Sequence, residues 1–391
     1  MTKTAIFVEV CQTNSSILSE EQIHSAVGVY ITKFVPTFRP GILVLDERRF
    51  AHCNDISFVR ISEMELDVLH FWEVDVHIRV FQLNSEEHNN MTLEDDDKIH
   101  ATTQWLLPHC NFENEWEQLH FDGDIKKTCL QYCRSALIFA EKEVSSSYVT
   151  FQKVLLAYGP PGTGKTTLIK GLAQKLAIRM NDVFPHTHFL EVNAHSLFSR
   201  WFSESGKLVQ RLFSHIQELT KDENTLVCVL IDEVESLVSS REASANGTEP
   251  GDAIRVVNAC LTQLDQLSRQ KNVFVFCTSN YSKSLDVAFI DRADLKLFIG
   301  NPSIKARFNI LKSAIDHMYD CEILSHTLGG ESLKKLMQIC EKGADISGRT
   351  LRKLPFLSYA KTYANQTSCI VDLESFLISL DCAIQDTVDS L

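Results

Sequence analysis

The sequence predicts an α/β protein in which helices sandwich a parallel sheet, with a small α+β domain before the sheet and a helical subdomain after it. Three observations support this fold class. Apolar runs of strand type alternate with stretches of helical periodicity through the middle of the chain. A glycine-rich loop at residues 159–166 (GPPGTGKT) joins one such strand to a helix. After Pro302 the periodicity is helical to the end.

The length of 391 residues suggests more than one core. We expect an N-terminal domain over residues 1–110, a large α/β subdomain over 111–301 and a helical lid over 302–391. The formal net charge of −13 argues against a general affinity for nucleic acid, so a protein partner is the better expectation. The 12 cysteines lack metal-site spacing and no signal peptide or bilayer-length apolar run is present, which indicates a nucleocytoplasmic protein with reduced thiols.

The N-terminal domain carries no nucleotide signature. We expect strands at residues 4–10, 42–45 and 74–80, and a helix with an acidic first turn at residues 19–33. The charge-rich segment 85–98 is predicted to be a solvated loop. An acidic patch that binds a partner is the alternative interpretation of this segment.

A helix predicted at residues 128–144 leads into the strand 154–158 (VLLAY) and then into the glycine-rich loop. The loop fits the pattern G-x-x-x-x-G-K-[ST], in which glycines let backbone N–H groups surround phosphate oxygens. Lys165 would reach the β- and γ-phosphates of ATP, and the Thr166 hydroxyl would bind Mg²⁺. A turn that matches by chance is the alternative. The expected nucleotide-binding residues of the loop are Gly159, Pro160, Pro161, Gly162, Thr163, Gly164, Lys165, Thr166 and Thr167.

The apolar run 226–231 (LVCVLI) is typical of a central parallel strand, and it ends in two carboxylates. Ligands bind at the C-terminal ends of such strands. We assign Asp232 to nucleotide and Mg²⁺ binding, and Glu233 to polarising the water that attacks the γ-phosphate. Two acidic residues that merely close a strand onto solvent are the alternative.

A further buried strand at residues 273–277 precedes Asn280. The neutral amide of Asn280 could hydrogen-bond both the γ-phosphate and the attacking water, although Asn is also a common turn residue. Strands at residues 189–192 and 296–299 complete the predicted sheet.

The four motifs GPPGTGKT, VLIDE, CTSN and RVVNACLTQLD (residues 255–265) together resemble the AAA+ ATPases over residues 112–391. The resemblance implies that Arg292 is the arginine finger that reaches a neighbouring subunit, where a guanidinium can stabilise the charge of the transition state. The usual pattern has two arginines around Pro-Gly, whereas this chain reads Asp291, Arg292, Ala293, Asp294. A surface salt bridge is the alternative for Arg292.

The segment 197–207 (LFSRWFSESGK) resembles the first pore loop of these ATPases. Trp201 and Phe202 fill the places of the aromatic and apolar residues that grip a translocating polypeptide, and core packing is the alternative. The Ser-, Gly- and Ala-rich segment 239–251 is a candidate for a second, flexible pore loop.

The lid is predicted to contain helices at residues 306–319, 332–340, 349–363 and 373–388. Ser347 is a plausible N-cap of the third helix. By resemblance, Arg349 is the second sensor, which contacts the γ-phosphate of the nucleotide bound by its own subunit; a solvated arginine is the alternative.

Longer strings, including HSLFSRWFSESGKL, TEPGDAIRVVNACLTQLDQ and SGRTLRKLPFL, closely resemble the pachytene-checkpoint AAA+ ATPases. The resemblance implies a homo-hexamer that converts closed HORMA-domain proteins to an open form, with a HORMA-type adaptor bound at the N-terminal domain. It also implies action at meiotic chromosome axes, the synaptonemal complex and kinetochores in the nucleus, with the cytoplasm as a second location. The residues alone support an ATP-hydrolysing ring with aromatic pore loops. A nucleotide-gated scaffold and a DNA-directed machine are the competing hypotheses.

Overall fold

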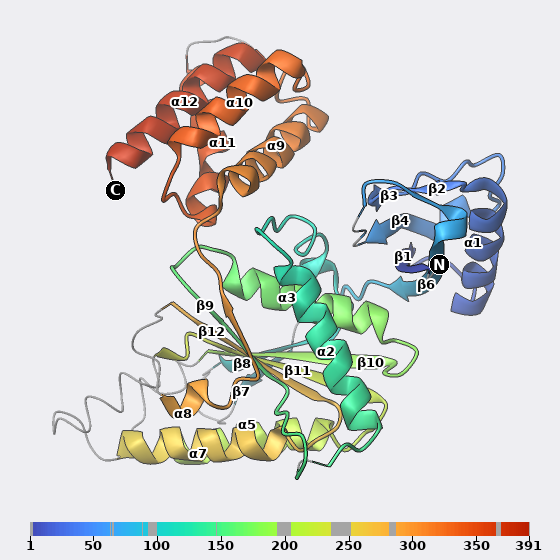
Figure 1. Cartoon of the computed structure of the whole chain (residues 1–391), viewed down its shortest axis with the longest axis vertical. Helices are drawn as coiled ribbons and strands as arrows, with labels where there is room; N and C mark the ends of the chain where they lie inside the picture. The colour runs from blue at the N-terminus through green and yellow to red at the C-terminus, as the bar shows by residue number, and fades with distance from the viewer. Residues whose placement is uncertain are drawn as a thin grey trace. The chain divides into compact units, whose positions relative to one another are not determined.

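The computed structural model describes residues 3–62, 64, 66–87, 89–92, 100–145, 147–193, 205–235, 252–280, 287–364 and 369–390 (Figure 1). The chain forms two compact units. The first comprises Met1–Glu113, Ala173–Glu191 and Ser214–Cys228, and the second comprises Asn114–Leu172, Val192–Phe213 and Val229–Leu391.

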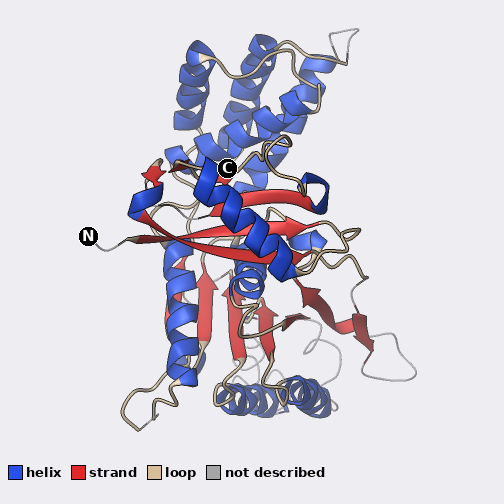
Figure 2. Cartoon of the chain, turned by 90° about the vertical axis from the view of Figure 1, so that its right-hand side faces the viewer, coloured by secondary structure: helices blue, strands red, loops and turns tan. Residues whose placement is uncertain are grey.

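The first unit contains a four-stranded sheet of order β3-β4-β1-β6. Its central strand β1 pairs antiparallel with β4 and parallel with β6, and helix α1 crosses one face of the sheet (Figure 2). Strands β2 and β5 form a separate two-stranded antiparallel sheet. The elements are β1 (Thr4–Gln12), α1 (Glu20–Phe34), β2 (Thr37–Phe38), β3 (Gly41–Ile42), β4 (Ile56–Ser62), β5 (Leu69–His70) and β6 (Val74–Gln82), with short 3-10 helices at Cys53–Asp55, Phe71–Glu73 and Cys110–Phe112.

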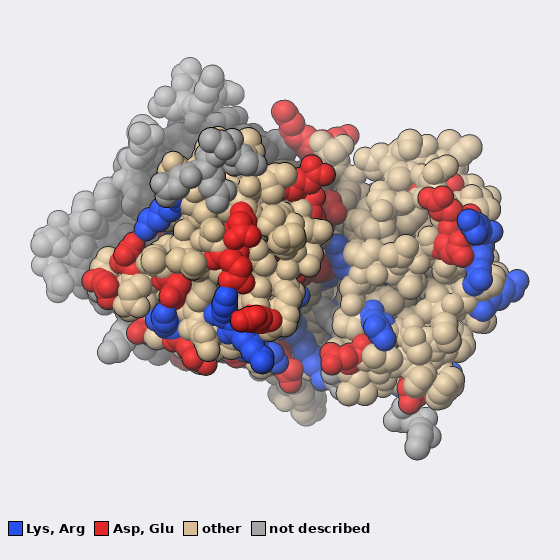
Figure 3. Space-filling view, turned by 90° about the horizontal axis from the view of Figure 1, so that it is seen from above, with Lys and Arg blue, Asp and Glu red and all other residues tan. Residues whose placement is uncertain are grey.

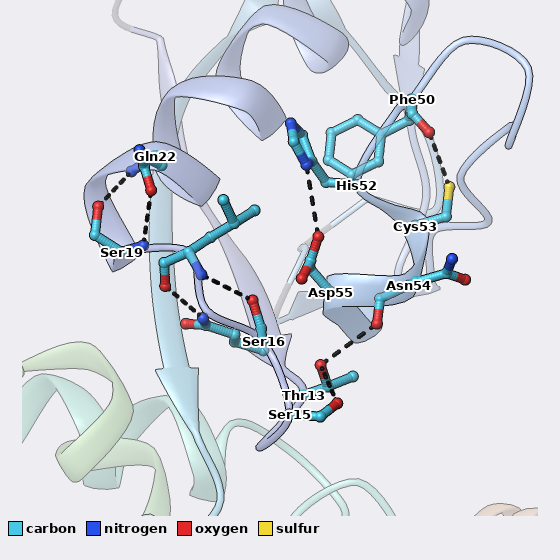
Figure 4. A network of polar contacts seen from close by, with 12 residues as sticks. Thr13, Ser15, Ser16, Ser19, Gln22, Phe50, His52, Cys53, Asn54 and Asp55 are labelled. Carbon is cyan, nitrogen blue, oxygen red and sulfur yellow. Dashed lines mark hydrogen bonds and ion pairs between the residues drawn. The ribbon is translucent and has the colours of Figure 1, made fainter.

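Helix α1 begins at a capping box that the sequence encodes locally. The Ser19 hydroxyl accepts from the Gln22 backbone N–H (3.3 Å), and the Gln22 side-chain oxygen accepts from the Ser19 N–H (3.0 Å) (Figure 4). Ile23, Val27 and Ile31 recur at helical spacing and are buried against the sheet. The helix predicted at residues 19–33 is therefore confirmed.

The strand predicted at residues 42–45 is shorter than expected. β3 comprises only Gly41 and Ile42, and it pairs with β4 over these two residues. Val44, inside the predicted strand, is 84% exposed, whereas Leu43 and Leu45 are partly buried and pack against the core although they lie outside β3.

The larger sheet has seven strands in the order β13-β9-β12-β11-β10-β8-β7, and β11 contributes residues to both units. β9 pairs in parallel with β12 and with β13, whereas β7 and β8 are antiparallel. β9, β11 and β12 are almost entirely buried, as expected of central parallel strands. The bounds are β7 (Asn89–Thr92), β8 (His100–Leu107), β9 (Val154–Tyr158), β10 (His186–Asn193), β11 (Thr225–Asp232), β12 (Val273–Ser279) and β13 (Leu295–Phe298).

Strand β7 lies inside the segment 85–98, for which a loop was expected. The prediction is wrong at residues 89–92, because backbone pairing with β8 makes a strand from a segment in which only Met91 is apolar. Residues 93–99, which hold most of the acidic run, lie outside the described part of the chain.

The second unit carries four helices of the lid, which follow β13 and pack on one another (Figure 1). Their shared core includes Leu311, Leu336, Leu354 and Phe376, all of which are fully buried. The helices of the larger subdomain and the lid are α2 (Ile125–Glu141), α3 (Lys165–Arg179, which continues into the first unit), α5 (Ser205–Leu219), α7 (Asp252–Leu267), α8 (Val287–Ile290), α9 (Ile304–Asp320), α10 (Gly330–Lys342), α11 (Gly348–Tyr363) and α12 (Leu373–Asp389).

Charged residues on the lid surface form neighbouring pairs. Lys342 contacts Asp381 and Lys361 contacts Asp386, each at 2.7 Å, and both pairs are largely exposed. Figure 3 shows acidic and basic side chains interspersed over the described residues of the face that it displays. Such exposed pairs add little to stability. Among the described helices, none is both long and apolar enough to cross a membrane.

The first unit has a buried ion pair. Lys175 Nζ on α3 donates to Glu9 Oε2 on β1 at 2.5 Å, and these side chains are 2% and 0% exposed. The Arg179 guanidinium, one turn further along α3, lies over the Phe7 ring at 4.4 Å. A buried ion pair thus holds the C-terminal half of α3 against the N-terminal sheet.

Candidate active site

A cavity of about 680 Å³ lies in the second unit at the C-terminal ends of β9, β11 and β12, where the glycine-rich loop, the strand tips and the lid meet. Most of the predicted site residues line it. They are Pro161, Gly162, Thr163, Gly164, Lys165, Thr166, Thr167, Asp232, Glu233, Asn280 and Arg349.

The start of the glycine-rich loop requires glycine. Gly159 has φ of +149°, and a Cβ built on it would lie 2.1 Å from the Ile299 carbonyl oxygen. Its backbone N–H donates to the Ser279 carbonyl at 3.2 Å. A side chain here would therefore force apart the loop and the chain that follows β13.

Lys165 is the first residue of α3 and is 6% exposed. Its ammonium donates to the carbonyls of Gly159 (3.0 Å) and Pro160 (2.7 Å). Burial lowers the pKa of Lys165, while the nearby carboxylates of Glu235 and Asp232 act in the opposite direction. The cation is thereby held within the loop, where a phosphate chain would replace the carbonyls as its partner.

Asp232, at the end of β11, and Thr166, at the start of α3, are in direct contact. The Thr166 hydroxyl donates to Asp232 Oδ1 at 3.1 Å and lies 3.3 Å from Oδ2. A hydroxyl and a carboxylate side by side suit Mg²⁺, which prefers oxygen ligands and keeps several waters. Among the described residues, no group of three or more His, Cys, Asp or Glu side chains could hold a metal ion, so a divalent ion here would depend on these two residues, water and phosphate oxygens.

Thr278, on β12, connects the two acidic residues of β11. Its hydroxyl donates to Asp232 Oδ1 and accepts from the Glu233 backbone N–H at 3.3 Å. Glu233 has φ of +58°, a conformation that is uncommon and costly for a residue with a side chain. Thr278 is 1% exposed, and its hydroxyl holds the strained turn that presents Glu233 to the cavity.

Asn280 lies directly beyond β12 and lines the cavity. Its backbone N–H donates to Glu235 Oε1 at 3.2 Å. Because β11 and β12 end at the same edge of the sheet, Asn280 and Glu233 line the same cavity.

The lid contacts the glycine-rich loop through the first turn of α11. Ser347 caps this helix by accepting from the Thr350 backbone N–H at 3.2 Å, which confirms its predicted role. The Arg349 backbone N–H donates to the Gly162 carbonyl at 2.9 Å. A Cβ on Gly162 would lie 3.0 Å from both the Ser347 hydroxyl and the Arg349 Cβ. The lid helix therefore begins directly on the loop.

Apolar side chains also line the cavity, and two of them, Leu119 and Phe121, lie beside Gly164 of the loop. Phe298 and Ile310 also line the cavity, and His120 contacts Ser313 of the lid at 3.5 Å. Burial lowers the pKa of His120 to about 4, so the imidazole is neutral at neutral pH. A flat heterocyclic base could pack here.

The sequence did not single out the segment 118–122, because it lies in irregular chain before the helix and carries no motif. Its mixed Leu, His and Phe composition offers a weak signal at best.

Arg292 is among the described residues but does not line this cavity. It forms an ion pair with Asp265 at the end of α7. The aromatic pair Trp201 and Phe202 and the segment 239–251 lie outside the described residues. The roles assigned to these residues therefore stay predictions.

Three family models match the chain. The model of the ATPase family associated with various cellular activities (AAA) matches residues 155–301. The TRIP13 N-terminal domain matches residues 1–86, and the TRIP13-like AAA+ ATPase lid C-terminal domain matches residues 327–388.

Individual proteins resemble the chain over nearly its full length. The pachytene checkpoint protein 2 homolog of Oryza sativa subsp. indica is 45% identical over 406 residues, covering 97% of this chain and 84% of the rice protein. The solved structure of C. elegans PCH-2 superposes with a TM-score of 0.81 at 31% identity, covering 99% of this chain and all of that one. A chain in the E. coli MS115-1 HORMA:CdnC:Trip13 complex shares the fold, with a TM-score of 0.56 at 19% identity over 71% of this chain and 93% of that chain.

Proposed function

Because the chain belongs to the pachytene checkpoint protein 2 family of AAA ATPases, we propose that it acts as an ATP-hydrolysing homo-hexamer that converts closed HORMA-domain proteins to an open, dissociated form. The observation that carries the ATPase part is the meeting of Lys165, Thr166, Asp232, Glu233 and Asn280 in one cavity. Their residue types supply the cation, the metal ligands, the base and the neutral amide that phosphoryl transfer needs.

Each of these side chains has a distinct role in the proposed reaction. Lys165 binds the β- and γ-phosphates of ATP, and Thr166 and Asp232 hold Mg²⁺, which neutralises the charge that develops on the phosphate oxygens when it is bound. Glu233 accepts a proton from the attacking water, and the Asn280 amide orients that water toward the γ-phosphate. The other predicted loop residues surround the phosphates with backbone N–H groups.

The lid supplies a way to couple hydrolysis to motion. The contact between the Arg349 N–H and the Gly162 carbonyl supports a role for α11 in sensing what the loop holds. In this proposal Arg349, which lines the cavity, contacts the γ-phosphate of the same subunit, and the loss of that phosphate frees the lid to turn. Arg292 completes the neighbouring subunit's site as an arginine finger.

The HORMA substrate rests on the family and on the E. coli complex, in which a Trip13 chain of this fold was solved together with HORMA protein. In this proposal the N-terminal domain (residues 1–110) docks the substrate with a HORMA-type adaptor, the α/β subdomain (111–301) and lid (302–391) hydrolyse ATP, and Trp201 and Phe202 pull on the substrate. The chain would act in the nucleus, on meiotic chromosome axes and at kinetochores, in recombination control and the spindle assembly checkpoint. No membrane or direct nucleic-acid contact is part of this mechanism.

Two alternatives predict different behaviour in solution. A remodeller of another protein substrate would hydrolyse ATP at a rate that closed HORMA proteins do not change. A nucleotide-gated scaffold would assemble on binding ATP and turn it over no faster than background.

The test is steady-state ATP turnover of the purified chain, with and without a closed HORMA-domain protein and its adaptor. We expect stimulation by the HORMA protein that disappears on Trp201→Ala, while Glu233→Gln removes turnover altogether. Robust turnover that ignores the HORMA protein would overturn the proposed substrate. Background turnover in a preparation shown by light scattering to be hexameric would overturn the proposed reaction in favour of the scaffold.

A further inference from the structure

Arg292 is held by a two-point contact with a residue of another element. Its Nε donates to Asp265 Oδ1 at 2.7 Å and its Nη2 donates to Asp265 Oδ2 at 2.8 Å. This is the bidentate geometry in which a carboxylate fixes both the position and the plane of a guanidinium. The Arg292 side chain is nevertheless 25% exposed, so the pair lies at the surface of the second unit.

The turn that carries Arg292 is fastened to the sheet as well. Asp294 Oδ2 accepts from the backbone N–H groups of Gln152 (2.7 Å) and Lys153 (2.8 Å), and from the Tyr132 hydroxyl (2.8 Å). The Asp294 backbone N–H donates to the Val154 carbonyl at 3.0 Å, at the start of β9. The backbone on one side of Arg292 therefore has a fixed anchor, while its guanidinium is anchored independently by α7.

Arg292 does not line the nucleotide cavity of its own subunit. It lines a separate cavity of about 770 Å³, together with Lys153, Asp265 and Arg269, and it is not among the residues around the glycine-rich loop. The guanidinium is bound to Asp265 beside this second cavity and is not among the groups that line the site of its own subunit. It can serve a site that another copy of the chain brings to this surface.

We infer that Asp265 is a positioning residue for hydrolysis in the neighbouring subunit: its carboxylate holds the Arg292 guanidinium at the angle that the neighbour's γ-phosphate requires. The inference rests on the proposed hexameric ATPase function. A long arginine side chain samples many rotamers. The two hydrogen bonds from Nε and Nη2 to Asp265 restrict it to one rotamer before the neighbouring subunit binds. Asp294 would fix the backbone and Asp265 the side chain, in place of the Pro-Gly turn that the sequence lacks.

The first test compares two substitutions of Asp265 with a control substitution on the lid. In Asp265→Asn the side-chain amide places an N–H group against a guanidinium N–H, so we expect kcat to fall by about tenfold to a hundredfold with little change in KM, because the nucleotide is bound by the other subunit. Asp265→Glu keeps the carboxylate and is expected to recover part of kcat. Asp316→Asn removes an exposed ion pair on the lid and is the matched control, expected to match wild type. Wild-type kcat in Asp265→Asn would overturn the inference.

The second test asks whether the effect crosses the subunit boundary. Glu233→Gln subunits lack their own catalysis but keep Asp265 and Arg292, whereas Asp265→Asn subunits have the reverse defect. When these two poorly active variants are mixed one to one and form rings together, turnover should be regained. Roughly one site in four then combines an intact Glu233 in its own subunit with an intact Asp265 and Arg292 in the neighbouring subunit. Asp265→Asn mixed with Arg292→Ala should regain none, and the double substitution should be no slower than Arg292→Ala alone.

The outcomes separate this inference from the proposed function. If Arg292→Ala and Glu233→Gln fail to complement each other, the arginine-finger role itself is wrong. If they complement but Asp265→Asn and Glu233→Gln do not, Arg292 acts across the boundary without Asp265 and only the positioning role is overturned. Light scattering shows whether every variant remains hexameric, and a variant that dissociates would assign Asp265 to assembly and likewise overturn the positioning role.

Discussion

Replacing Thr278 by valine should slow ATP hydrolysis without disturbing the fold. Valine has nearly the shape of threonine and also favours strands, so β12 and its neighbours should keep their packing around this buried position. The change removes one hydroxyl, which donates to Asp232 and accepts from the Glu233 N–H. Both residues of the β11 tip thus lose a partner at once.

The size of the effect follows from these two contacts. A hydrogen bond to a charged carboxylate contributes about 1.5–3 kcal/mol, and the backbone N–H of a strained residue loses a further acceptor. Since each 1.4 kcal/mol is about a tenfold change in rate, we expect kcat to fall by roughly 10- to 150-fold. The Mg²⁺ concentration needed for half-maximal turnover should rise, because Asp232 would be held less firmly beside Thr166.

The assay is steady-state ATP turnover across a Mg²⁺ titration, together with the affinity for a fluorescent ATP analogue. Thr278→Ser keeps the hydroxyl and should remain near wild type. Thr262→Val, which removes an exposed hydroxyl bonded within α7 to the Asn258 carbonyl, controls for loss of any threonine. Wild-type turnover in Thr278→Val, or an equal defect in Thr278→Ser, would refute the role given to this hydroxyl.

Three further predictions concern other parts of the chain. Gly159→Ala should weaken ATP binding by about 10- to 100-fold, because its Cβ would lie 2.1 Å from the Ile299 carbonyl; direct binding measures this, and wild-type affinity would contradict the loop geometry. Lys175→Met should destabilise the first unit by about 1.5–3 kcal/mol, because the buried Glu9 carboxylate loses its 2.5 Å partner and keeps the Arg179 guanidinium at 3.7 Å, and adding Glu9→Leu should restore part of the thermal stability; a double variant as unstable as the single one would count against this. Burial lowers the pKa of Lys153 to about 8, so above that pH the native protein loses a proton that the unfolded chain keeps. The free energy of unfolding should therefore rise from pH 8 to about 10. Lys153→Met should lack this gain in melting temperature, and parallel pH profiles of the two proteins would refute the prediction.

Most residues of the cavity could be predicted from the sequence, because nucleotide chemistry requires particular residue types at fixed spacing. In the structure Gly159 directly follows β9, Lys165 begins α3 and Asp232 ends β11, which is the strand–loop–helix context that the motif requires. The central strands could also be predicted, because strands that are buried on both faces appear in the sequence as unbroken apolar runs.

Other features depend on contacts that no single stretch encodes. Neither β8 nor β7 was predicted from the sequence: residues 100–107 (HATTQWLL) show no regular alternation, and the mostly polar β7 is a strand because it pairs with β8. The support of Glu233 by Thr278 and of Arg292 by Asp265 links residues 45 and 27 positions apart. Such contacts form only in the tertiary structure, and the periodicity of the sequence does not predict them.

The most direct test of the account is a single-turnover comparison of wild type and Glu233→Gln, with ATP binding and phosphate release measured on the same samples. We expect unchanged ATP affinity and phosphate release slowed at least a hundredfold, because the amide cannot accept the proton of the attacking water. Phosphate release within a few fold of wild type would contradict the assignment of Glu233, and with it the catalytic role given to this cavity.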